Sequence, residues 1–320
     1  MNFYAQLVGQ NQAVELLTQA VVQNRVAPAY LFAGASGVGR SLVARCFIEQ
    51  LFCVSVPTHK QPFAQSHRLQ LGNHPDLLWV QPTYLHQGQR LSADEAAAAG
   101  LKRKAPPVIR LEQIREIAQF LGRSPLEASR NVVVLEQAET MAESAANALL
   151  KTLEEPGQAT LILIAPSSES LLPTLVSRCQ RIPFYRLDKA GMTQVLQQTG
   201  HAEILNQLPV LAIAQGSPGE AISSWQQLQT IPSDLLQAVK APPNSLKDAL
   251  ETARNIDKTL DTEAQLWLVD YLQHCYWQQF LIGTMHKSPL QQLEKARKSL
   301  LCYAQPRLVW ECTLLALCQA

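Results

Sequence analysis

The residues most able to do chemistry form a glycine-rich stretch near the N-terminus. The segment 34–41, Gly34-Ala-Ser-Gly-Val-Gly-Arg-Ser41, has the spacing G-x-x-x-x-G-K-[S/T] of a phosphate-binding loop, with arginine in place of lysine. In such a loop backbone N–H groups bind phosphate, the lysine reaches the β- and γ-phosphates, and the hydroxyl holds magnesium. Arg40 keeps the charge but not the compact ammonium, so the segment predicts a nucleotide-binding fold and argues against full activity.

A second candidate group follows the apolar run at 132–135. Glu136 could serve a magnesium ion at the end of this predicted strand. Hydrolysis also needs a group that deprotonates or orients water, and Gln137 is an amide, which cannot act as a general base. Because Arg40 and Gln137 are separate departures, we expect no competent ATPase. Whether ATP or ADP still binds without hydrolysis stays open. The degenerate nucleotide site comprises Gly34, Gly37, Gly39, Arg40, Ser41 and Glu136.

The elements that must position these residues alternate between strands and helices. Apolar runs predict buried strands at 29–33, 77–80, 131–135 and 160–164. Helical spacing of apolar residues predicts helices at 5–24, 42–52, 110–121 and 145–153, the last closed by Pro156. This alternation indicates a parallel α/β sheet with right-handed crossovers, and it places the loop at a strand-to-helix turn.

Beyond Phe184 the strand signals stop and the pattern is helical. Connectors are expected at 231–233 and 241–244, and the stretch 84–107 reads as an insertion without an assigned role. Large aromatic side chains lie near the C-terminal end. They fit a helix-bundle core and a face reserved for a neighbouring subunit equally well: Trp267, Tyr271, Trp277 and Phe280.

Composition limits the possible partners and compartment. The formal charge of +1, with 17% charged residues, argues against a strongly basic nucleic-acid binder, so contact with DNA should be shared with partners.

Seven cysteines lie without CxxC pairs, and neither a signal peptide nor a bilayer-spanning apolar run is recognised, which favours a reduced, cytoplasmic protein. The spacing of the residues nearest to a zinc pattern matches no standard site, so we expect no metal there: Cys46, Cys53, His59, His67 and His74.

Five short motifs carry a family resemblance. They are Gly9-Gln10, Ala29-Tyr-Leu-Phe32, His74-Pro-Asp76, the ten residues Asn147–Pro156 (NALLKTLEEP), and Ser177-Arg-Cys179. With these motifs the sequence resembles the delta-prime family of bacterial DNA polymerase III clamp-loader subunits, a branch of the AAA+ proteins, over most of the first 225 residues. The loop alone would not be specific, whereas the ten-residue run and the Ser-Arg-Cys triplet are.

The resemblance implies a role for one arginine. In clamp loaders the arginine of the triplet reaches into the ATP site of the adjacent subunit, so Arg178 is the candidate arginine finger acting in trans. The alternative is a structural arginine at the entrance to a strand. Motor subunits of the family also carry an ATP-sensing threonine and arginine, where this chain has Ala165-Pro166 and Gly219. Both departures agree with a subunit that does not hydrolyse ATP.

The resemblance therefore implies a rigid, stator-like subunit of a clamp loader. Its fold would be a parallel-sheet AAA+ P-loop domain at 1–185, a helical lid at 186–228 and an all-α collar at 229–320. Its partners would be the gamma/tau motor subunits, the delta subunit, the sliding clamp and primer-template DNA. Two alternatives remain: an ATP-hydrolysing motor subunit of the same machine, and an unrelated small-molecule kinase or nucleotide switch, which leaves the Ser177–Cys179 triplet unexplained.

Overall fold

The computed structural model describes residues 3–54, 74–99, 106–154, 157–240, 242–243, 245–283 and 289–318. The chain divides into two compact units, Met1–Leu187 and Asp188–Ala320. The first unit holds every strand of the described chain, and the second holds only helical elements. His59, His67 and the last two residues of the motif at 147–156 lie outside the described residues.

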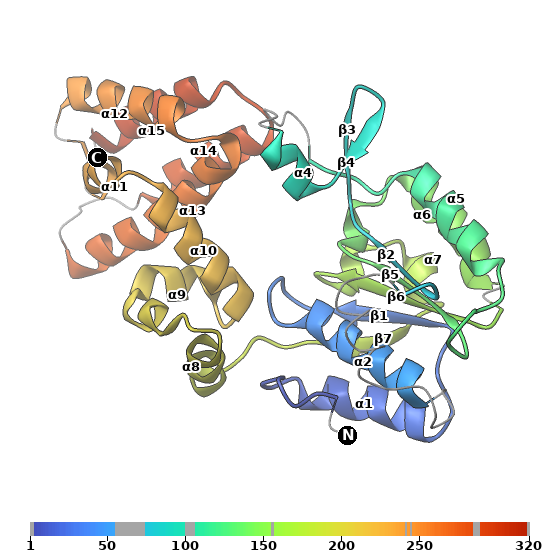
Figure 1. Ribbon diagram of the computed structural model, residues 1–320. Helices are drawn as coiled ribbons and strands as arrows, with labels where there is room; N and C mark the ends of the chain where they lie inside the picture. Colours follow the sequence, from blue (N-terminus) through green and yellow to red (C-terminus); the bar gives the residue numbers. More distant parts are fainter. Residues whose placement is uncertain are drawn as a thin grey trace. The chain divides into compact units, whose positions relative to one another are not determined.

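One parallel sheet forms the centre of the first unit (Figure 1). Its strands, in spatial order, are β2 (Leu77–Val80), β5 (Asn131–Leu135), β6 (Ala159–Ala165), β1 (Ala29–Ala33) and β7 (Gln180–Pro183). The four predicted strands are confirmed to within one residue at each end. The sequence analysis missed β7, because its first two residues are exposed and its apolar signal is short.

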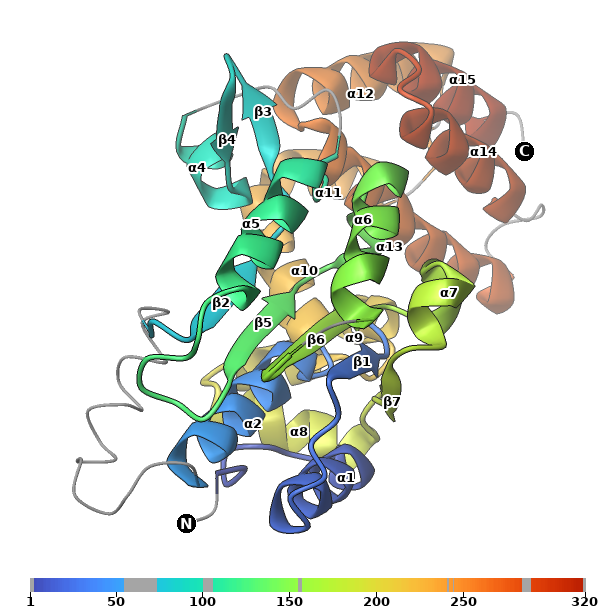
Figure 2. The ribbon, with the colours of Figure 1, turned by 90° about the vertical axis from the view of Figure 1, so that its right-hand side faces the viewer.

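Alternating residues of the strands point to two separate hydrophobic cores. Tyr30 and Phe32 pack on the face covered by α1 (Asn11–Val22) and α2 (Arg40–Val54). Leu31 packs on the opposite face, which is covered by α5 (Leu111–Leu121), α6 (Glu143–Glu154) and α7 (Pro173–Val176) (Figure 2). Because helices cover both faces, the strands read as continuous apolar runs and not as alternating ones.

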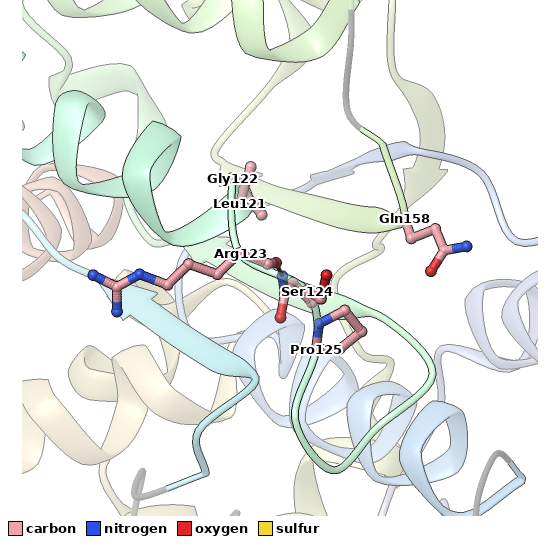
Figure 3. A pocket seen from close by; sticks show the side chains of 7 residues that line it. Leu121, Gly122, Arg123, Ser124, Pro125 and Gln158 are labelled. Carbon is pink, nitrogen blue, oxygen red and sulfur yellow. Dashed lines mark hydrogen bonds between the residues drawn. The ribbon is translucent and has the colours of Figure 1, made fainter.

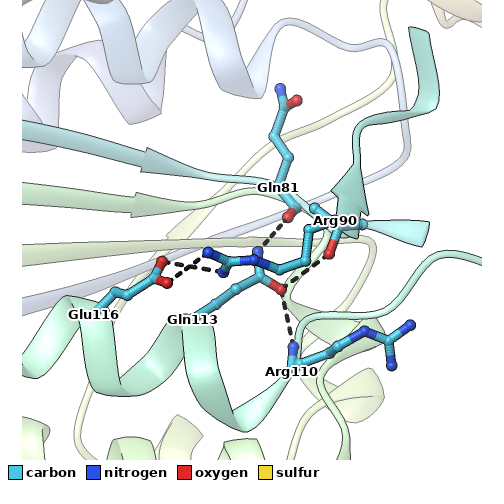
Figure 4. Close-up of polar contacts among 6 residues, drawn as sticks. Gln81, Arg90, Arg110, Gln113 and Glu116 are labelled. Atoms are coloured by element: carbon cyan, nitrogen blue, oxygen red, sulfur yellow. Dashed lines mark hydrogen bonds and ion pairs between the residues drawn. The ribbon is translucent and has the colours of Figure 1, made fainter. Parts of the chain in front are cut away.

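The predicted insertion folds into a hairpin and a short helix. Strand β3 (Tyr84–His86) pairs antiparallel with β4 (Gln89–Leu91), and α4 (Ala93–Ala98) follows. Gln87 and Gly88 form the two-residue turn with φ values of 49° and 81°, which is the left-handed geometry that a tight hairpin needs. Arg90 pins the hairpin to α5 through two contacts with Glu116, at 3.1 and 2.5 Å (Figure 4).

The second unit is helical throughout its described part. Its elements are α8 (Lys189–Gln198), η3 (Ala202–Asn206), α9 (Leu208–Ala214), α10 (Pro218–Thr230), α11 (Ser233–Val239), α12 (Leu246–Thr259), α13 (Thr262–Ile282), α14 (Leu290–Leu301) and α15 (Pro306–Cys318). The indole of Trp310 donates to Gln265 at 2.8 Å inside its core. None of the described helices has an apolar stretch long enough to cross a membrane.

Helix α13 divides its aromatic side chains between core and surface. Tyr271 and Tyr276 are buried in the helical core. Trp277 and Phe280 stack on each other with ring centroids 5.4 Å apart, next to the exposed Ile282. The middle of the helix thus forms the core, as one alternative predicted, and its end exposes apolar surface; that this end faces a neighbouring subunit stays a prediction.

Candidate functional site

The glycine-rich loop leaves the carboxyl end of β1 and enters α2. A Cβ atom at Gly34 would lie 2.5 Å from the carbonyl oxygen of Phe184, so close packing after β7 requires glycine there. Gly39 has a φ of 100°, which only glycine adopts readily. Helix α2 begins at Arg40, two residues earlier than predicted, so Arg40 and Ser41 lie in its first turn. The loop therefore has the strand-to-helix geometry expected for phosphate binding.

A buried glutamine holds this loop, and the sequence analysis gave it no role. The Gln10 amide donates to the carbonyl oxygens of Val38, at 3.2 Å, and Tyr185, at 2.6 Å. Its own carbonyl accepts from the backbone N–H of Tyr185 at 3.0 Å. Gln10 thus joins the loop to the segment after β7, which explains the Gly9-Gln10 motif as a structural contact.

Replacing Gln10 with alanine should weaken the first unit. The change removes the hydrogen-bond partner of the buried Val38 carbonyl and of the partly buried backbone N–H and carbonyl groups of Tyr185, which we expect to lower the free energy of unfolding by about 2 kcal/mol. Gln12→Ala is the matched control, because Gln12 is exposed on α1 and should change stability by less than about 0.5 kcal/mol. Urea unfolding of both variants measures the difference; equal stabilities would contradict the role of Gln10.

The two predicted parts of the nucleotide site meet at Glu136. The Ser41 hydroxyl donates a hydrogen bond to Oε1 of Glu136. Oε2 accepts from the indole N–H of Trp79 at 3.0 Å and from the Gln81 amide at 2.7 Å. Burial alone would raise the pKa of Glu136, but these three hydrogen bonds and the nearby Arg45 hold the pKa below its ordinary value. The carboxylate is therefore ionised and well supplied with donors.

Arg40 occupies the place of the loop lysine with incomplete pairing. Its Nη1 atom is buried and has no hydrogen-bond acceptor among the described residues. Burial lowers the pKa of Arg40, and the carboxylates of Glu139 and Glu136 oppose this shift. An unpaired guanidinium N–H at the start of α2 is compatible with a phosphate oxygen at the loop.

The residues fit a magnesium ion less well than they fit a phosphate. The Ser41 hydroxyl can rotate away from Glu136, but the indole N–H of Trp79 can only donate and already points at the carboxylate. A magnesium ion or its water shell would have to displace these donors. Gln137, next in sequence, is an exposed amide with φ of 50°, so the position after Glu136 carries no carboxylate.

Arg178 lies apart from the loop, just after α7. Its Nη1 atom donates to the carbonyl oxygen of Thr174 at 3.0 Å, and Nη2 contacts Glu154 Oε1 at 2.7 Å. The Arg178 side chain is 37% exposed, so part of the guanidinium remains at the surface. Glu154, the last residue of α6, lies in the ten-residue motif, but its pairing with Arg178 was not predicted.

The segment His74-Pro-Asp76 organises a backbone turn. Asp76 accepts hydrogen bonds from three consecutive backbone N–H groups, those of Leu126, Glu127 and Ala128, each at 2.7 Å. The ring of His74 stacks near Phe52, with centroids 4.5 Å apart. These contacts give the motif a structural role.

The cysteines near this segment do not favour metal binding. Burial raises the pKa of the Cys46 thiol to about 11 and also raises that of Cys53, so both stay protonated near neutral pH. Within the described part of the chain, no group of three or more histidine, cysteine or acidic residues is placed to hold a metal ion. The predicted absence of zinc remains a prediction, because His59 and His67 are not described.

A hollow of about 360 Å³ lies at the other end of the sheet (Figure 3). It is lined by the segment 121–125 after α5, by Asn131 at the start of β5, and by Gln158 before β6. Ligands of parallel α/β sheets bind at the carboxyl ends of the strands, where the glycine-rich loop lies. The Asn131 amide donates to the Arg123 carbonyl at 2.6 Å, so part of the polar lining is already paired. The hollow is therefore not the candidate site.

Two family models together match nearly the whole chain. One, described as DNA polymerase III, delta subunit, matches residues 9–188. The other, described as Cyanobacterial DNA polymerase III delta prime, C-terminal domain, matches residues 190–317. The boundary between the two matches coincides with the boundary between the two compact units.

Individual relatives agree with this assignment. The chain is 30% identical to the DNA polymerase III subunit delta' of Bacillus subtilis over 192 residues, 59% of this chain and 52% of that protein. It is 33% identical to the subunit delta' of Pseudomonas aeruginosa over 200 residues, 60% of this chain and 54% of that protein. The B. subtilis subunit tau is 25% identical over 246 residues, 74% of this chain and 40% of that protein. The chain spans about half the length of the two delta' relatives it matches.

A solved structure confirms the fold class. A DNA polymerase III gamma subunit-related protein from Thermotoga maritima superposes with a TM-score of 0.54 at 18% identity, covering 97% of this chain and 99% of that chain. This likeness concerns the fold alone: an α/β domain with a parallel sheet, followed by a helical region. Because the two family models together match residues 9–188 and 190–317, and the relatives named subunit delta' agree with them, the chain belongs to the delta-prime family of DNA polymerase III clamp-loader subunits.

Proposed function

We propose that this chain is a non-hydrolysing, stator-like subunit of a DNA polymerase III clamp loader and lends Arg178 to the ATP site of a neighbouring subunit. Its partners would be the gamma/tau motor subunits, the delta subunit, the sliding clamp and primer-template DNA, and it would act in the cytoplasm. Within the helical unit, residues 186–228 would form a lid and residues 229–320 the collar that joins the complex.

The observation that carries this proposal is the contrast between two sites on one chain. The chain's own nucleotide site has arginine for lysine at position 40 and an amide at Gln137. Arg178, by comparison, is held at the surface by Glu154 and Thr174. A cation presented outward, beside a loop that lacks a general base, supports a role in catalysis on another chain.

The chemistry of Arg178 follows from its donors. A guanidinium has five N–H groups in a plane, and each terminal nitrogen carries two of them. Nη1 is engaged by the Thr174 carbonyl and Nη2 by Glu154, each through one contact. Among the residues that the structure describes, the remaining N–H groups have no further partner, so they can approach the charge that develops on a transferring phosphoryl group, which is how an arginine finger accelerates the reaction.

Reconstitution tests the function. We expect a clamp loader assembled without this chain to lose loading of the clamp onto primed DNA, and the chain to restore that loading. The purified chain alone should hydrolyse ATP no faster than its Ser41→Ala variant. Turnover by the chain alone that disappears in Ser41→Ala would instead identify a motor subunit, and loading that is unaffected by omission of the chain would exclude the stator role.

A further inference from the structure

We propose that Glu136 is a structural latch in this chain and not a magnesium ligand, so that the loop is held closed by protein contacts and any nucleotide it takes is bound without the metal. The inference concerns the isolated chain and does not depend on the role of Arg178. It rests on three sets of contacts around the carboxylate.

The first set fills both carboxylate oxygens. Oε1 accepts the Ser41 hydroxyl, while Oε2 accepts Trp79 Nε1 at 3.0 Å and Gln81 Nε2 at 2.7 Å. A carboxylate offers about four acceptor positions, and three are taken here by groups that carry partial positive charge. Ser41 belongs to α2, Glu136 follows β5, and Trp79 and Gln81 come from β2 and its end. One side chain therefore joins three elements.

The second set ties α2 to β2 directly. The guanidinium carbon of Arg45 lies 4.8 Å from the centroid of the Trp79 ring, in the arrangement of a cation–π contact. Arg45 is four residues after Ser41, so both face the same side of the helix. Because Arg45 covers the Trp79 ring, the indole cannot easily swing away from Glu136 to make room for a metal ion.

The third set of contacts holds the backbone of Gln81 against α5 (Figure 4). Its backbone carbonyl accepts the Gln113 amide of α5 at 2.9 Å. The side-chain carbonyl of Gln113 in turn accepts a hydrogen bond from the backbone N–H of Arg110, the N-cap residue of the same helix, at 3.0 Å. Gln113 is buried, so the packing of α5 holds the backbone of Gln81, and the exposed side-chain amide of Gln81 reaches Glu136 from this fixed position.

Electrostatics distinguishes a latch from a metal ligand. A metal-binding carboxylate usually destabilises the metal-free protein, because its partly buried charge has no compensating partner until the metal binds. Here the carboxylate already accepts three hydrogen bonds, from the Ser41 hydroxyl, the Trp79 indole and the Gln81 amide. The ionised form is thus already stabilised by the fold, and a magnesium ion would have to replace bonds that are in place.

The phosphate side of the site differs from the metal side. Arg40 retains a buried Nη1 that lacks an acceptor among the described residues, whereas Glu136 has no shortage of donors. A phosphate oxygen would supply the acceptor that Arg40 lacks, whereas the donors around Glu136 already compensate its charge without a cation. Binding of a nucleotide, where it occurs, should therefore be indifferent to magnesium.

Thermal unfolding of the purified chain tests this directly. The midpoint should be the same with ATP and EDTA as with ATP and magnesium chloride, and magnesium chloride alone should have no effect. A higher midpoint with ATP and magnesium than with ATP and EDTA would overturn the proposal, because it would show that the metal contributes to binding at the loop.

Substitution of the latch gives a second readout. Glu136→Ala should lower the midpoint by roughly 5 °C, since three donors lose their acceptor. The matched control is Glu143→Ala, at the exposed start of α6, where little stability is expected to be lost. Equal midpoints for the two variants would contradict a latch.

A double-mutant cycle isolates the central contact. Trp79→Phe keeps an aromatic ring under Arg45 but removes the N–H that reaches Glu136. It should lower the midpoint in the wild-type background by more than it does in Glu136→Ala, because the shared hydrogen bond is already absent there. Equal effects in the two backgrounds would show that Trp79 and Glu136 are not coupled, and the latch would be rejected.

Discussion

Replacing Arg178 with alanine is expected to slow the DNA-stimulated ATPase of a reconstituted clamp loader that contains this chain. An arginine finger contributes roughly 10³-fold or more to the rate at the single site it serves. The other ATP sites of the complex keep their own catalytic residues, so steady-state turnover should fall by about the fraction that one site contributes. Single-turnover measurements on the assembled complex should resolve that site as a slow phase.

Three comparisons separate this effect from a loss of structure. Arg181→Ala removes another exposed arginine only three residues away and should leave the ATPase unchanged. Arg178→Lys keeps the charge without the planar fork and should restore only part of the rate. Assembly of Arg178→Ala should be normal, because its ion pair with Glu154 is half exposed and contributes little stability. ATPase and clamp loading at the wild-type level in Arg178→Ala would remove the finger role.

The strands that carry the site were predictable because their residue types leave little choice. The four-residue apolar run at 132–135 is typical of a strand covered on both faces, and all five residues of β5 are buried. Strand β7 was not predicted, since only Ile182 in it is buried and the rest of its signal is polar. The hairpin at 84–91 was missed although Gln87-Gly88 is the kind of pair that a two-residue turn favours.

The candidate site was predictable only in part, for a related reason. The loop and Glu136 follow from spacing along the chain, and the structure joins them through Ser41. Trp79, Gln81 and Gln10 could not be assigned, because their contacts depend on which strands become neighbours in the sheet. Sequence separation hides such contacts: Gln10 and Tyr185 lie 175 residues apart and still share two hydrogen bonds.

Asp76 is expected to be the largest single contributor to stability among the acidic residues of the first unit. It is 1% exposed and accepts the backbone N–H groups of three residues in succession, 126–128. The backbone carbonyl of Asp76 accepts a hydrogen bond from the backbone N–H of Val132, at the start of β5, at 2.8 Å. The carboxylate therefore holds the connection between α5 and the central strand, and its loss would remove the acceptor of three partly buried backbone N–H groups.

Asp76→Ala should lower the free energy of unfolding of the first unit by roughly 3 to 4 kcal/mol, because each unpaired donor costs about 1 kcal/mol or more. The matched control is Asp257→Ala on α12, where the aspartate is exposed and a change within about 0.5 kcal/mol is expected. Because the chain has two compact units, hydrogen exchange at residues 126–128 is the suitable measurement. Unchanged protection of these amides would contradict the role of Asp76.

The contribution of Asp76 to the free energy of unfolding should decrease as the solution is acidified. Burial alone would raise the pKa of Asp76, but the three N–H groups and His74 hold it below its ordinary value. The unfolded chain has an aspartate pKa of about 3.9, so the unfolded state takes up protons first as the solution is acidified. The contribution of Asp76 is therefore complete above the unfolded pKa and is lost as the pH falls through the folded one. The stability gap between wild type and Asp76→Asn should stay constant above about pH 5 and narrow as the pH falls below the unfolded pKa of about 3.9; a gap that stays constant in acid would show that the ionised carboxylate is not what holds the turn.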